Sequence, residues 1–304
     1  MISIIAPVHN EKENLTEFND RVLSVMQTIG EKYEVIYIDD GSNDGSLSII
    51  KELKKQSDFV HYISLQRNFG QHAAIMAGLK SAEGDIVITL DTDLQNPPEE
   101  ITKLVGEIKK GFDVVSTKRI SRKDNILRTI ASNLMNKIIS RLTGVKLNDY
   151  GCMMRAYTRK ISNMLLEHGE KSVYIPAFTS WLSSNIKEIE IQHDRRKRGK
   201  TKYSFLKLLN QAFDLITAYT LLPIQIISIA GFLLFIAGIF LFSYLMYFRI
   251  FVGSPSSLTS FIAILIFLSG TILLSLGIIS EYLARMYREV KKTPFYIIKE
   301  NSKK

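Results

Sequence analysis

Two carboxylates separated by one residue end an apolar segment of this chain. Asp91 and Asp93 follow residues 86–90, Ile-Val-Ile-Thr-Leu, which have the composition of a buried strand. Alternate side chains of an extended chain lie on the same side, so these two carboxylates share one side. Paired oxygen ligands, together with substrate phosphates, usually hold Mg²⁺ or Mn²⁺ in phosphate chemistry. The pair is therefore a candidate metal site.

Polar residues also follow other apolar runs of the N-terminal half. In open α/β sheets, ligands bind outside the carboxyl ends of the strands. One such cluster is equally typical of a turn, but four that meet at one edge of a sheet predict a binding site. The clusters are Pro7, Asn10 and Glu11 after residues 3–6, Asp39 and Asp40 after 35–38, Arg67 and Asn68 after 60–65, and Asp91 to Asp93 after 86–90.

The elements that must position these residues follow the spacing of βαβ units. Strands are expected at 3–6, 35–38, 60–65, 86–90 and 114–117, and helices at 14–29, 46–55, 72–81 and 98–110. The last helix begins with Pro98, followed by Glu99 and Glu100, which is typical of a helix start. We predict an α/β fold with a mostly parallel sheet flanked by helices.

Several classes of protein are disfavoured by what the sequence lacks. It contains neither Gly-x-Gly-x-x-Gly nor Gly-x-x-x-x-Gly-Lys, which argues against a classical dinucleotide enzyme and a P-loop NTPase. Cys152 is the single cysteine, so it forms no internal disulfide and is expected to be a small buried thiol. The residues before Pro7 do not resemble a signal peptide, so we expect the N-terminal part to stay where it is made.

The C-terminal third predicts two membrane spans. No charged residue lies between Asp214 and Arg249 or between Arg249 and Glu281, and each stretch exceeds the roughly 20 apolar residues that a span needs. We place the spans at 223–247 and 258–279. Residues 201–222 predict an amphipathic helix along the membrane interface, with a packed core helix as the alternative. The expected organisation is an α/β domain (1–200), this helix (201–222), a transmembrane hairpin (223–280) and a basic tail (281–304).

The charge distribution orients this hairpin. The net charge of +9 indicates an anionic partner, and Lys and Arg crowd both outer flanks of the two spans. The loop between the spans carries only Arg249. By the positive-inside rule, both termini and the α/β domain are expected on the cytoplasmic side of a cell membrane.

Four motifs of the sequence resemble the family 2 glycosyltransferases of the GT-A fold. The resemblance covers nearly the whole chain. Within the family it is strongest to the polyprenyl-phosphate branch that includes dolichyl-phosphate mannose synthase, and there to the subgroup that transfers 4-deoxy-4-formamido-L-arabinose to undecaprenyl phosphate. The residues 149–157 and Lys202-Tyr203-Ser204-Phe205 carry this last likeness. The four family motifs are Ile4-Ile5-Ala6-Pro7-Val8-His9-Asn10-Glu11, Ile38-Asp39-Asp40-Gly41-Ser42-Asn43-Asp44-Gly45-Ser46, Arg67-Asn68-Phe69-Gly70 and Asp91-Thr92-Asp93-Leu94-Gln95-Asn96-Pro97-Pro98.

The resemblance implies roles for individual residues. It implies a nucleotide-sugar donor whose base and ribose are held at Pro7, Glu11, Asp39 and Asp40, and a metal and diphosphate site at Asp91, Asp93 and Gln95. It also implies an in-line displacement with inversion at the sugar carbon. Asn10, Arg67 and Thr92 lie in the same strand-end segments, so we add them to the candidate donor site.

The acceptor implied by the resemblance is a polyprenyl phosphate, undecaprenyl or dolichyl. A lipid phosphate is already an anion, so it needs positive charge rather than a general base. Asp149 is a candidate catalytic residue that could orient one of these cations, or else a turn residue before Gly151. The resemblance also matches Arg196-x-x-Gly199-x-Thr201-Lys202-Tyr203 to the family's basic motif near the membrane, where Thr201 replaces the more usual Ser. The candidate phosphate-binding residues are Arg119, Arg122, Arg128, Arg196, Arg198, Lys200, Thr201 and Lys202.

The sequence bears on three other functions. Another lipid acceptor, such as a diacylglycerol, is the main alternative. A processive polysaccharide synthase is disfavoured because the single Trp181 lacks the Gln-x-x-Arg-Trp context and two spans are few for a polymer channel. A basic nucleic-acid-binding protein is disfavoured because the densest positive cluster adjoins a span while acidic pairs occupy the predicted site. The sequence does not determine the oligomeric state, and a homo-oligomer is compatible with it.

Overall fold

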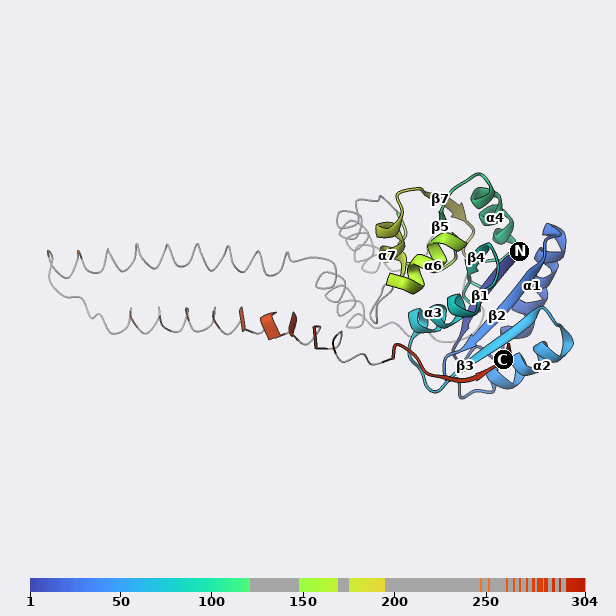
Figure 1. The fold of residues 1–304 in the computed structure, drawn as a ribbon, viewed down its shortest axis with the longest axis horizontal. Coiled ribbons are helices and arrows are strands. Elements are labelled where there is room, and N and C mark those ends of the chain that lie inside the picture. Colours follow the sequence, from blue (N-terminus) through green and yellow to red (C-terminus); the bar gives the residue numbers. More distant parts are fainter. Residues whose placement is uncertain are drawn as a thin grey trace. The chain divides into compact units, whose positions relative to one another are not determined.

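A computed structural model describes residues 1–120, 148–168, 175–194 and 294–303, and single positions between 247 and 290 (Figure 1). The chain divides into two compact units. One comprises Met1–Lys202 with Pro294–Lys304, and the other comprises Tyr203–Thr293. The last residues of the chain therefore belong with the N-terminal unit, although the second unit separates them from it in sequence.

A mixed sheet lies at the centre of the first unit. Its strands are β1 (Ile2–Val8), β2 (Tyr33–Asp39), β3 (Val60–Leu65), β4 (Ile86–Thr89), β5 (Val114–Arg119), β6 (Arg155–Thr158), β7 (Ile186–Ile191) and β8 (Ile298–Asn301). Among the described residues the strand order is β7-β5-β6-β4-β1-β2-β3-β8.

The neighbours β4, β1, β2 and β3 run parallel, as the βαβ spacing predicts. The prediction of a mostly parallel sheet is wrong for the rest of the sheet, which is mixed, although β5 and β7 also pair in parallel. β6 is antiparallel to both β4 and β5, and β8 is antiparallel to β3. The regular βαβ spacing extends only through β5, and β6 and β8 join the sheet after longer intervening segments.

Helices cover both faces of this sheet. α1, α2 and α4 pack on one face, and α3 and α6 pack on the other (Figure 1). All five predicted strands and all four predicted helical segments are confirmed to within a few residues. β6, β7, β8, α6 and α7 were not predicted. The helices are α1 (Leu15–Ile29), α2 (Ser46–Gln56), α3 (Gln71–Ser81), the 3₁₀ turn η1 (Pro98–Glu100) with α4 (Ile101–Lys109), α6 (Arg159–His168) and α7 (Ile175–Leu182).

The core explains why the central strands are apolar at successive positions. Ile4 and Ile5 point to opposite faces of β1, and both are fully buried because helices cover each face. On the face covered by α1, the ring of Phe18 packs edge-on against Tyr37, whose hydroxyl donates to Asn19 Oδ1 at 3.0 Å. Cys152 is buried, as predicted.

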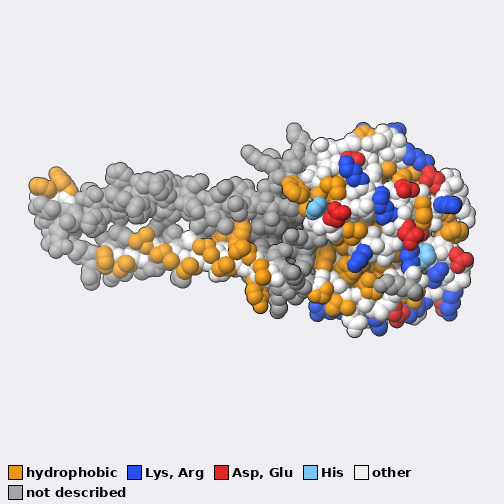
Figure 2. Space-filling model, in the orientation of Figure 1, with side chains coloured by type: hydrophobic (Ala, Val, Ile, Leu, Met, Phe, Trp, Pro, Cys, Tyr) orange, Lys and Arg blue, Asp and Glu red, His pale blue; other side chains and the backbone are white. Residues whose placement is uncertain are grey.

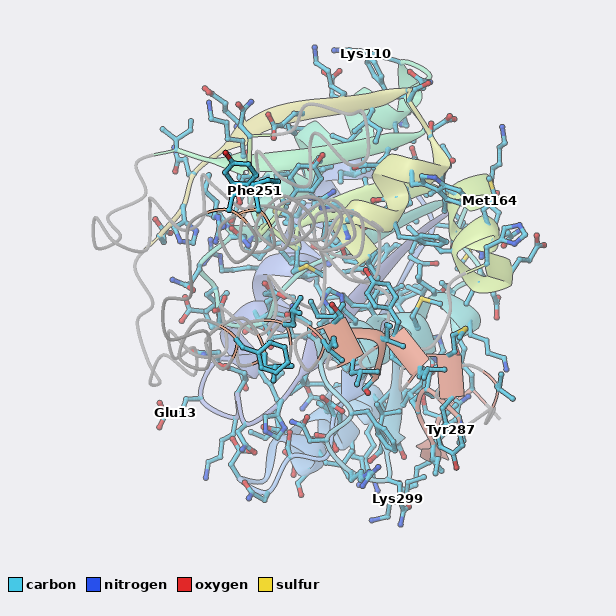
Figure 3. The ribbon with its side chains drawn as sticks, turned by 90° about the vertical axis from the view of Figure 1, so that its left-hand side faces the viewer. Glu13, Lys110, Met164, Phe251, Tyr287 and Lys299 are labelled. Carbon is cyan, nitrogen blue, oxygen red and sulfur yellow. The ribbon has the colours of Figure 1, made fainter. Side chains whose placement is uncertain are left out.

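The C-terminal residues add an edge strand that the sequence analysis did not predict. Lys299 on β8 and Lys110, near the start of β5, lie at opposite ends of the domain in Figure 3. Lys303 forms an ion pair with the buried carboxylate of Glu34. Burial alone would raise the pKa of Glu34, but hydrogen bonds from Lys303 and Ser3 hold it below its ordinary value. The end of the chain is thus an integral part of this domain.

The predicted membrane segments are not tested by the described residues. Among these, no helix is both long enough and apolar enough to cross a membrane. The expected segments at 201–222, 223–247 and 258–279 lie almost entirely outside them. The described positions between 247 and 290 are helical, and most of their large apolar side chains are exposed, including 60% of Phe261 and 79% of Val290 (Figure 2).

Candidate active site

The loops that follow β1 and β2 are joined at the carboxyl end of the sheet. The Asn10 N–H donates to Ser42 Oγ at 3.0 Å, and the Asn43 N–H donates to Asn10 Oδ1 at 2.9 Å. The Glu11 N–H donates to Ser46 Oγ at 3.1 Å. Asn10 has a φ of 57°, a conformation that Asn tolerates better than most residues. These contacts fix the loop that carries Asn10 and Glu11.

The carboxylates at the end of β2 are buried and accept hydrogen bonds from neighbouring segments. Ser64 Oγ donates to Asp39 at 3.2 Å. The N–H groups of Phe69 and Gly70 donate to the two oxygens of Asp40 at 2.7 and 2.9 Å. Burial raises the pKa of Asp40, and these two N–H groups oppose the shift. Asp40 therefore ties the loop after β3 to the end of β2.

Gly41 allows these two loops to approach each other. Its φ is 65°, and a Cβ atom at this position would lie 2.6 Å from both the carbonyl carbon of Arg67 and the nitrogen of Asn68. The guanidinium of Arg67 lies 5.0 Å from the centre of the Phe69 ring. The close approach places Arg67 beside the acidic end of β2.

Asp91 lies in a cluster of negative charge. Gln71 Nε2 donates to Asp91 Oδ1 at 2.5 Å. Burial and the carboxylates of Asp93 and Glu11 raise the pKa of Asp91 to about 7, while the charge of Arg119 opposes the shift. The three carboxylates repel one another, and a bound cation would relieve that repulsion.

The turn after Asp91 is tight and internally bonded. Leu94 has a φ of 60°, an uncommon conformation for a residue with a large side chain, and it is buried. This turn lets the Gln95 N–H donate to Asp93 Oδ1 at 3.1 Å. Thr92 Oγ1 donates to the carbonyl oxygen of Pro7 at 3.3 Å, which ties the turn to β1.

The donor set suits one kind of metal ion. The described residues contain no group of three or more His, Cys, Asp or Glu side chains that could hold a metal. Asp91 and Asp93 are two hard oxygen donors, and Gln95 follows them in the same turn. Mg²⁺ is typically bound by one or two carboxylates and takes its remaining ligands from water and substrate phosphates. The residues present fit that pattern.

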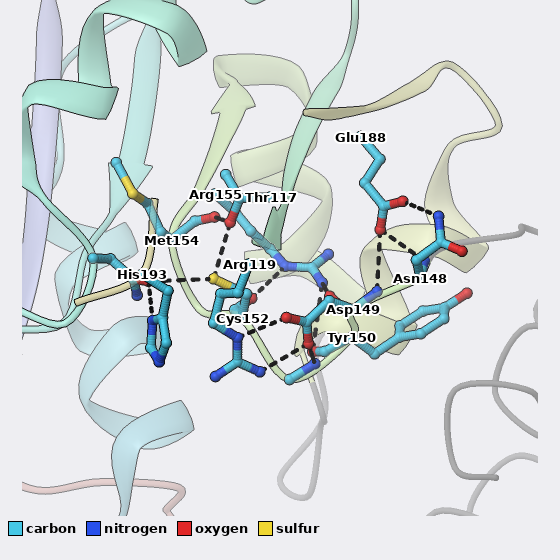
Figure 4. A network of polar contacts seen from close by, with 12 residues as sticks. Thr117, Arg119, Asn148, Asp149, Tyr150, Cys152, Met154, Arg155, Glu188 and His193 are labelled. Atoms are coloured by element: carbon cyan, nitrogen blue, oxygen red, sulfur yellow. Dashed lines mark hydrogen bonds and ion pairs between the residues drawn. The ribbon is translucent and has the colours of Figure 1, made fainter. Parts of the chain in front are cut away.

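Arg119, the last residue of β5, forms a two-pronged ion pair with Asp149 (Figure 4). Its Nε donates to Asp149 Oδ2 at 2.6 Å, and an Nη donates to Oδ1 at 2.9 Å. The side chains of Arg119 and Asp149 are only 13% and 5% exposed. The charge of Arg119 also lowers the pKa of Asp91. Asp149 therefore orients the guanidinium of Arg119, whose positive charge partly offsets the negative charge around Asp91.

Two charged residues that the sequence analysis overlooked hold the turn that carries Asp149. Glu188 on β7 accepts the N–H groups of Asn148 and Asp149 at 2.7 and 3.1 Å (Figure 4). Arg155 is fully buried, and its Nε donates to the carbonyl oxygen of Cys152 at 3.0 Å. An arginine within the apolar run 152–157 was the available signal, because buried arginines usually have a specific partner.

The predicted site residues thus fall into two groups. The structure brings together Pro7, Asn10, Glu11, Asp39, Asp40, Arg67, Asp91, Thr92, Asp93, Gln95, Arg119 and Asp149, through the contacts and charges described above. The other predicted acceptor residues lie outside the described residues, and their role stays a prediction. They are Arg122, Arg128, Arg196, Arg198, Lys200, Thr201 and Lys202.

Solved structures with the same architecture contain nucleotides and metal ions. Glucosyl-3-phosphoglycerate synthase from Mycobacterium tuberculosis, in complex with Mn²⁺, uridine diphosphate and phosphoglyceric acid, matches 71% of this chain and 78% of its own with a TM-score of 0.53. A complex of the same enzyme with Mg²⁺ and uridine diphosphate matches with a TM-score of 0.52. The identities are 16% and 15%, so these matches show the GT-A fold alone.

The sequence comparisons reach further. Residues 3–166 match the family described as glycosyl transferase family 2. The undecaprenyl-phosphate 4-deoxy-4-formamido-L-arabinose transferase of Proteus mirabilis is 40% identical over 98% of this chain and 93% of its own length. The transferase of the same name from Shewanella sediminis is 40% identical over 98% and 92%. A family match over more than half of the chain and relatives of nearly full length show that the chain is a glycosyltransferase and belongs to glycosyl transferase family 2.

Proposed function

We propose that this enzyme transfers a sugar from a nucleotide-sugar donor to a polyprenyl phosphate, with Mg²⁺ or Mn²⁺ held by Asp91 and Asp93. Two relatives that align with 98% of the chain are named as transferases that act on undecaprenyl phosphate. The observation that carries the proposal is the placement of the acidic pair and the Arg119–Asp149 ion pair around one edge of the sheet. 4-Deoxy-4-formamido-L-arabinose is the first donor sugar to test.

The donor would lie across the ends of four parallel strands. We assign its base and ribose to the segments after β1 and β2, which carry Pro7, Asn10, Glu11, Asp39 and Asp40. The internal hydrogen bonds of Asn10 and Asp40 support this assignment, because they hold the two loops in place before a ligand arrives. The diphosphate would then lie near Arg67, Thr92 and Gln95.

The reaction forms one bond and breaks one bond at the anomeric carbon. An oxygen of the lipid phosphate attacks this carbon while its bond to the diphosphate oxygen breaks, and the nucleoside diphosphate leaves. The divalent ion, when bound, neutralises charge that develops on this leaving group. The attacking phosphate is already deprotonated at neutral pH, so Asp149 is needed to orient Arg119 rather than as a base. Arg119 would draw the anionic acceptor toward an anionic donor.

We also propose that the enzyme is anchored by a transmembrane hairpin at 223–280, behind an interfacial helix at 201–222. Residues 203–293 leave the first unit and return to it, since β8 pairs with β3. Any membrane crossings within this segment must therefore be even in number. The exposed apolar side chains at described positions between 247 and 290 support a lipid environment.

This topology predicts the side of the membrane on which each segment lies. We expect Ser254→Cys to react with a membrane-impermeant maleimide in intact cells, because residue 254 lies in the loop between the predicted spans. Lys110→Cys and Lys299→Cys, both at exposed positions, should react only after the membrane is opened. The native Cys152 is buried and serves as the unreactive background. Labelling of Lys110→Cys or Lys299→Cys in intact cells would contradict the assignment.

The function itself is tested with the purified full-length enzyme in detergent. Undecaprenyl phosphate, dolichyl phosphate and diacylglycerol are each supplied with a panel of nucleotide sugars, and the lipid products are identified by mass spectrometry. We expect a glycosyl phospholipid with a polyprenyl phosphate, and none without a divalent cation. Transfer to diacylglycerol alone would replace the proposed acceptor with the main alternative.

A further inference from the structure

Gln71 is the first residue of α3, and the surrounding structure holds it firmly. The two residues before it, Phe69 and Gly70, donate their N–H groups to the buried carboxylate of Asp40. The helix that follows is buried along most of its length. A Cβ atom on Gly78 would lie 2.5 Å from a side-chain carbon of Ile5, so α3 packs directly against the sheet. The backbone of Gln71 therefore has little freedom to move.

The side chain of Gln71 reaches a residue that lies 20 positions further along the chain. Its Nε2 donates to Asp91 Oδ1 at 2.5 Å. In the ionised state that would bind a metal, the carboxylate can only accept hydrogen bonds, so the amide presents its NH₂ group to Asp91. Among the described residues, Gln71 is the side chain that donates a hydrogen bond to the Asp91 carboxylate.

The two carboxylates of the acidic pair are therefore held in different ways. Asp93 accepts the N–H of Gln95 from its own turn, so local backbone geometry orients it. Asp91 lies two residues after the end of β4 and depends on an amide from another segment. With Oδ1 engaged by Gln71, the Asp91 carboxylate has a fixed rotamer, and Oδ2 and the remaining lone pairs stay available for a ligand.

We propose that Gln71 is a positioning residue that orients the Asp91 carboxylate for the divalent cation and the donor diphosphate. The inference rests on the proposed metal site. Gln71 also connects the donor loops to that site. Asp40 holds residues 69–70, and Gln71, the next residue, holds Asp91. Partners that orient metal ligands in this way typically contribute about 10- to 100-fold to metal affinity.

The test measures Mn²⁺ binding to the full-length enzyme by electron paramagnetic resonance, with and without uridine diphosphate. Gln71→Met keeps the length of the side chain but removes the donor, and we expect Mn²⁺ to bind about 10- to 100-fold more weakly. Gln71→Asn, whose amide is too short to reach, should show the same loss. Gln56→Met changes an exposed glutamine at the end of α2 and should bind Mn²⁺ like the wild type.

A double-mutant cycle separates this role from simple support of α3. If Gln71 acts through Asp91, adding Gln71→Met to Asp91→Asn should weaken Mn²⁺ binding no further, whereas independent effects would add. Wild-type affinity in Gln71→Met, with Mn²⁺ binding lost in Asp93→Ala, would overturn the inference and leave the metal site standing. Wild-type affinity in Asp93→Ala as well would overturn both.

Discussion

Asp93→Ala is expected to lower the turnover of the enzyme about 10²- to 10³-fold, the range found when one group that stabilises transition-state charge is removed. Asp93 has the second carboxylate of the Asp-x-Asp pair that follows the buried strand β4, beside the other strand-end ligands. Its loss would leave Asp91 as the one carboxylate of that pair. The diphosphate leaving group would then develop its charge with a weakly held metal ion or none.

The fold should survive this change. The hydrogen bond from the Gln95 N–H to Asp93 Oδ1 lies within one turn, so its loss costs about 1 kcal/mol of unfolding free energy. Turnover is measured with metal and donor in excess, and thermal unfolding is followed by circular dichroism. Asp58→Ala removes an exposed carboxylate just before β3 and should match the wild type in both measurements. Near-normal turnover of Asp93→Ala under these conditions would remove the metal site from the proposed mechanism.

The central part of the fold was predictable because its signals are local. The strands β1 to β5 appear as apolar runs, and the helices between them have the expected spacing. The edge strand β8 has the sequence Ile-Lys-Glu-Asn and carries almost no local strand signal. It is a strand because β3 would otherwise present an unpaired edge, and such long-range pairing cannot be read from four residues.

β6 was missed for a related reason. Arg155 begins a strand of four residues, and an arginine is rarely found fully buried. Antiparallel pairing on both sides, to β4 and β5, holds this short segment in the sheet. The guanidinium of Arg155 donates a hydrogen bond to the carbonyl oxygen of Cys152. This contact forms only when the turn before the strand is folded.

The location of the site was predictable from the sequence, but the hydrogen bonds between its residues were not. Because parallel strands end at one edge, the sequence was enough to gather Asp39, Asp40 and Asp91 in one place. It could not show that Asp40 holds the backbone of the loop after β3, or that Gln71 reaches Asp91. Such contacts depend on rotamers and loop geometry, which residue types and spacing leave open.

Asp149→Asn is expected to lower turnover about 10²-fold, because a misplacement of about 1 Å in a positioned group can have an effect of this size. The amide has one oxygen and cannot accept both prongs of the Arg119 guanidinium, which would lose the carboxylate that it faces. Both side chains are largely buried, so we also expect a loss of about 3 kcal/mol in unfolding free energy.

Arg119→Lys tests whether the geometry of this ion pair or its charge is required. Lysine keeps the positive charge but cannot form the two-pronged contact, so we expect a similar loss of turnover together with a raised KM for the polyprenyl phosphate. The neighbouring exposed pair Lys118–Glu190 provides a matched control. Glu190→Gln should leave both the unfolding free energy and turnover unchanged, because solvent screens this exposed pair.

The double variant distinguishes an orienting carboxylate from a general base. If Asp149 acts by holding Arg119, Asp149→Asn combined with Arg119→Lys should be little slower than either single variant, because both remove the same arrangement. If Asp149 were a base, its removal would slow the reaction further in the Arg119→Lys background and would abolish the acidic limb of the pH–rate profile. A profile that keeps its acidic limb in Asp149→Asn supports the orienting role, since the limb then reports another group, such as Asp91, whose pKa is raised to about 7.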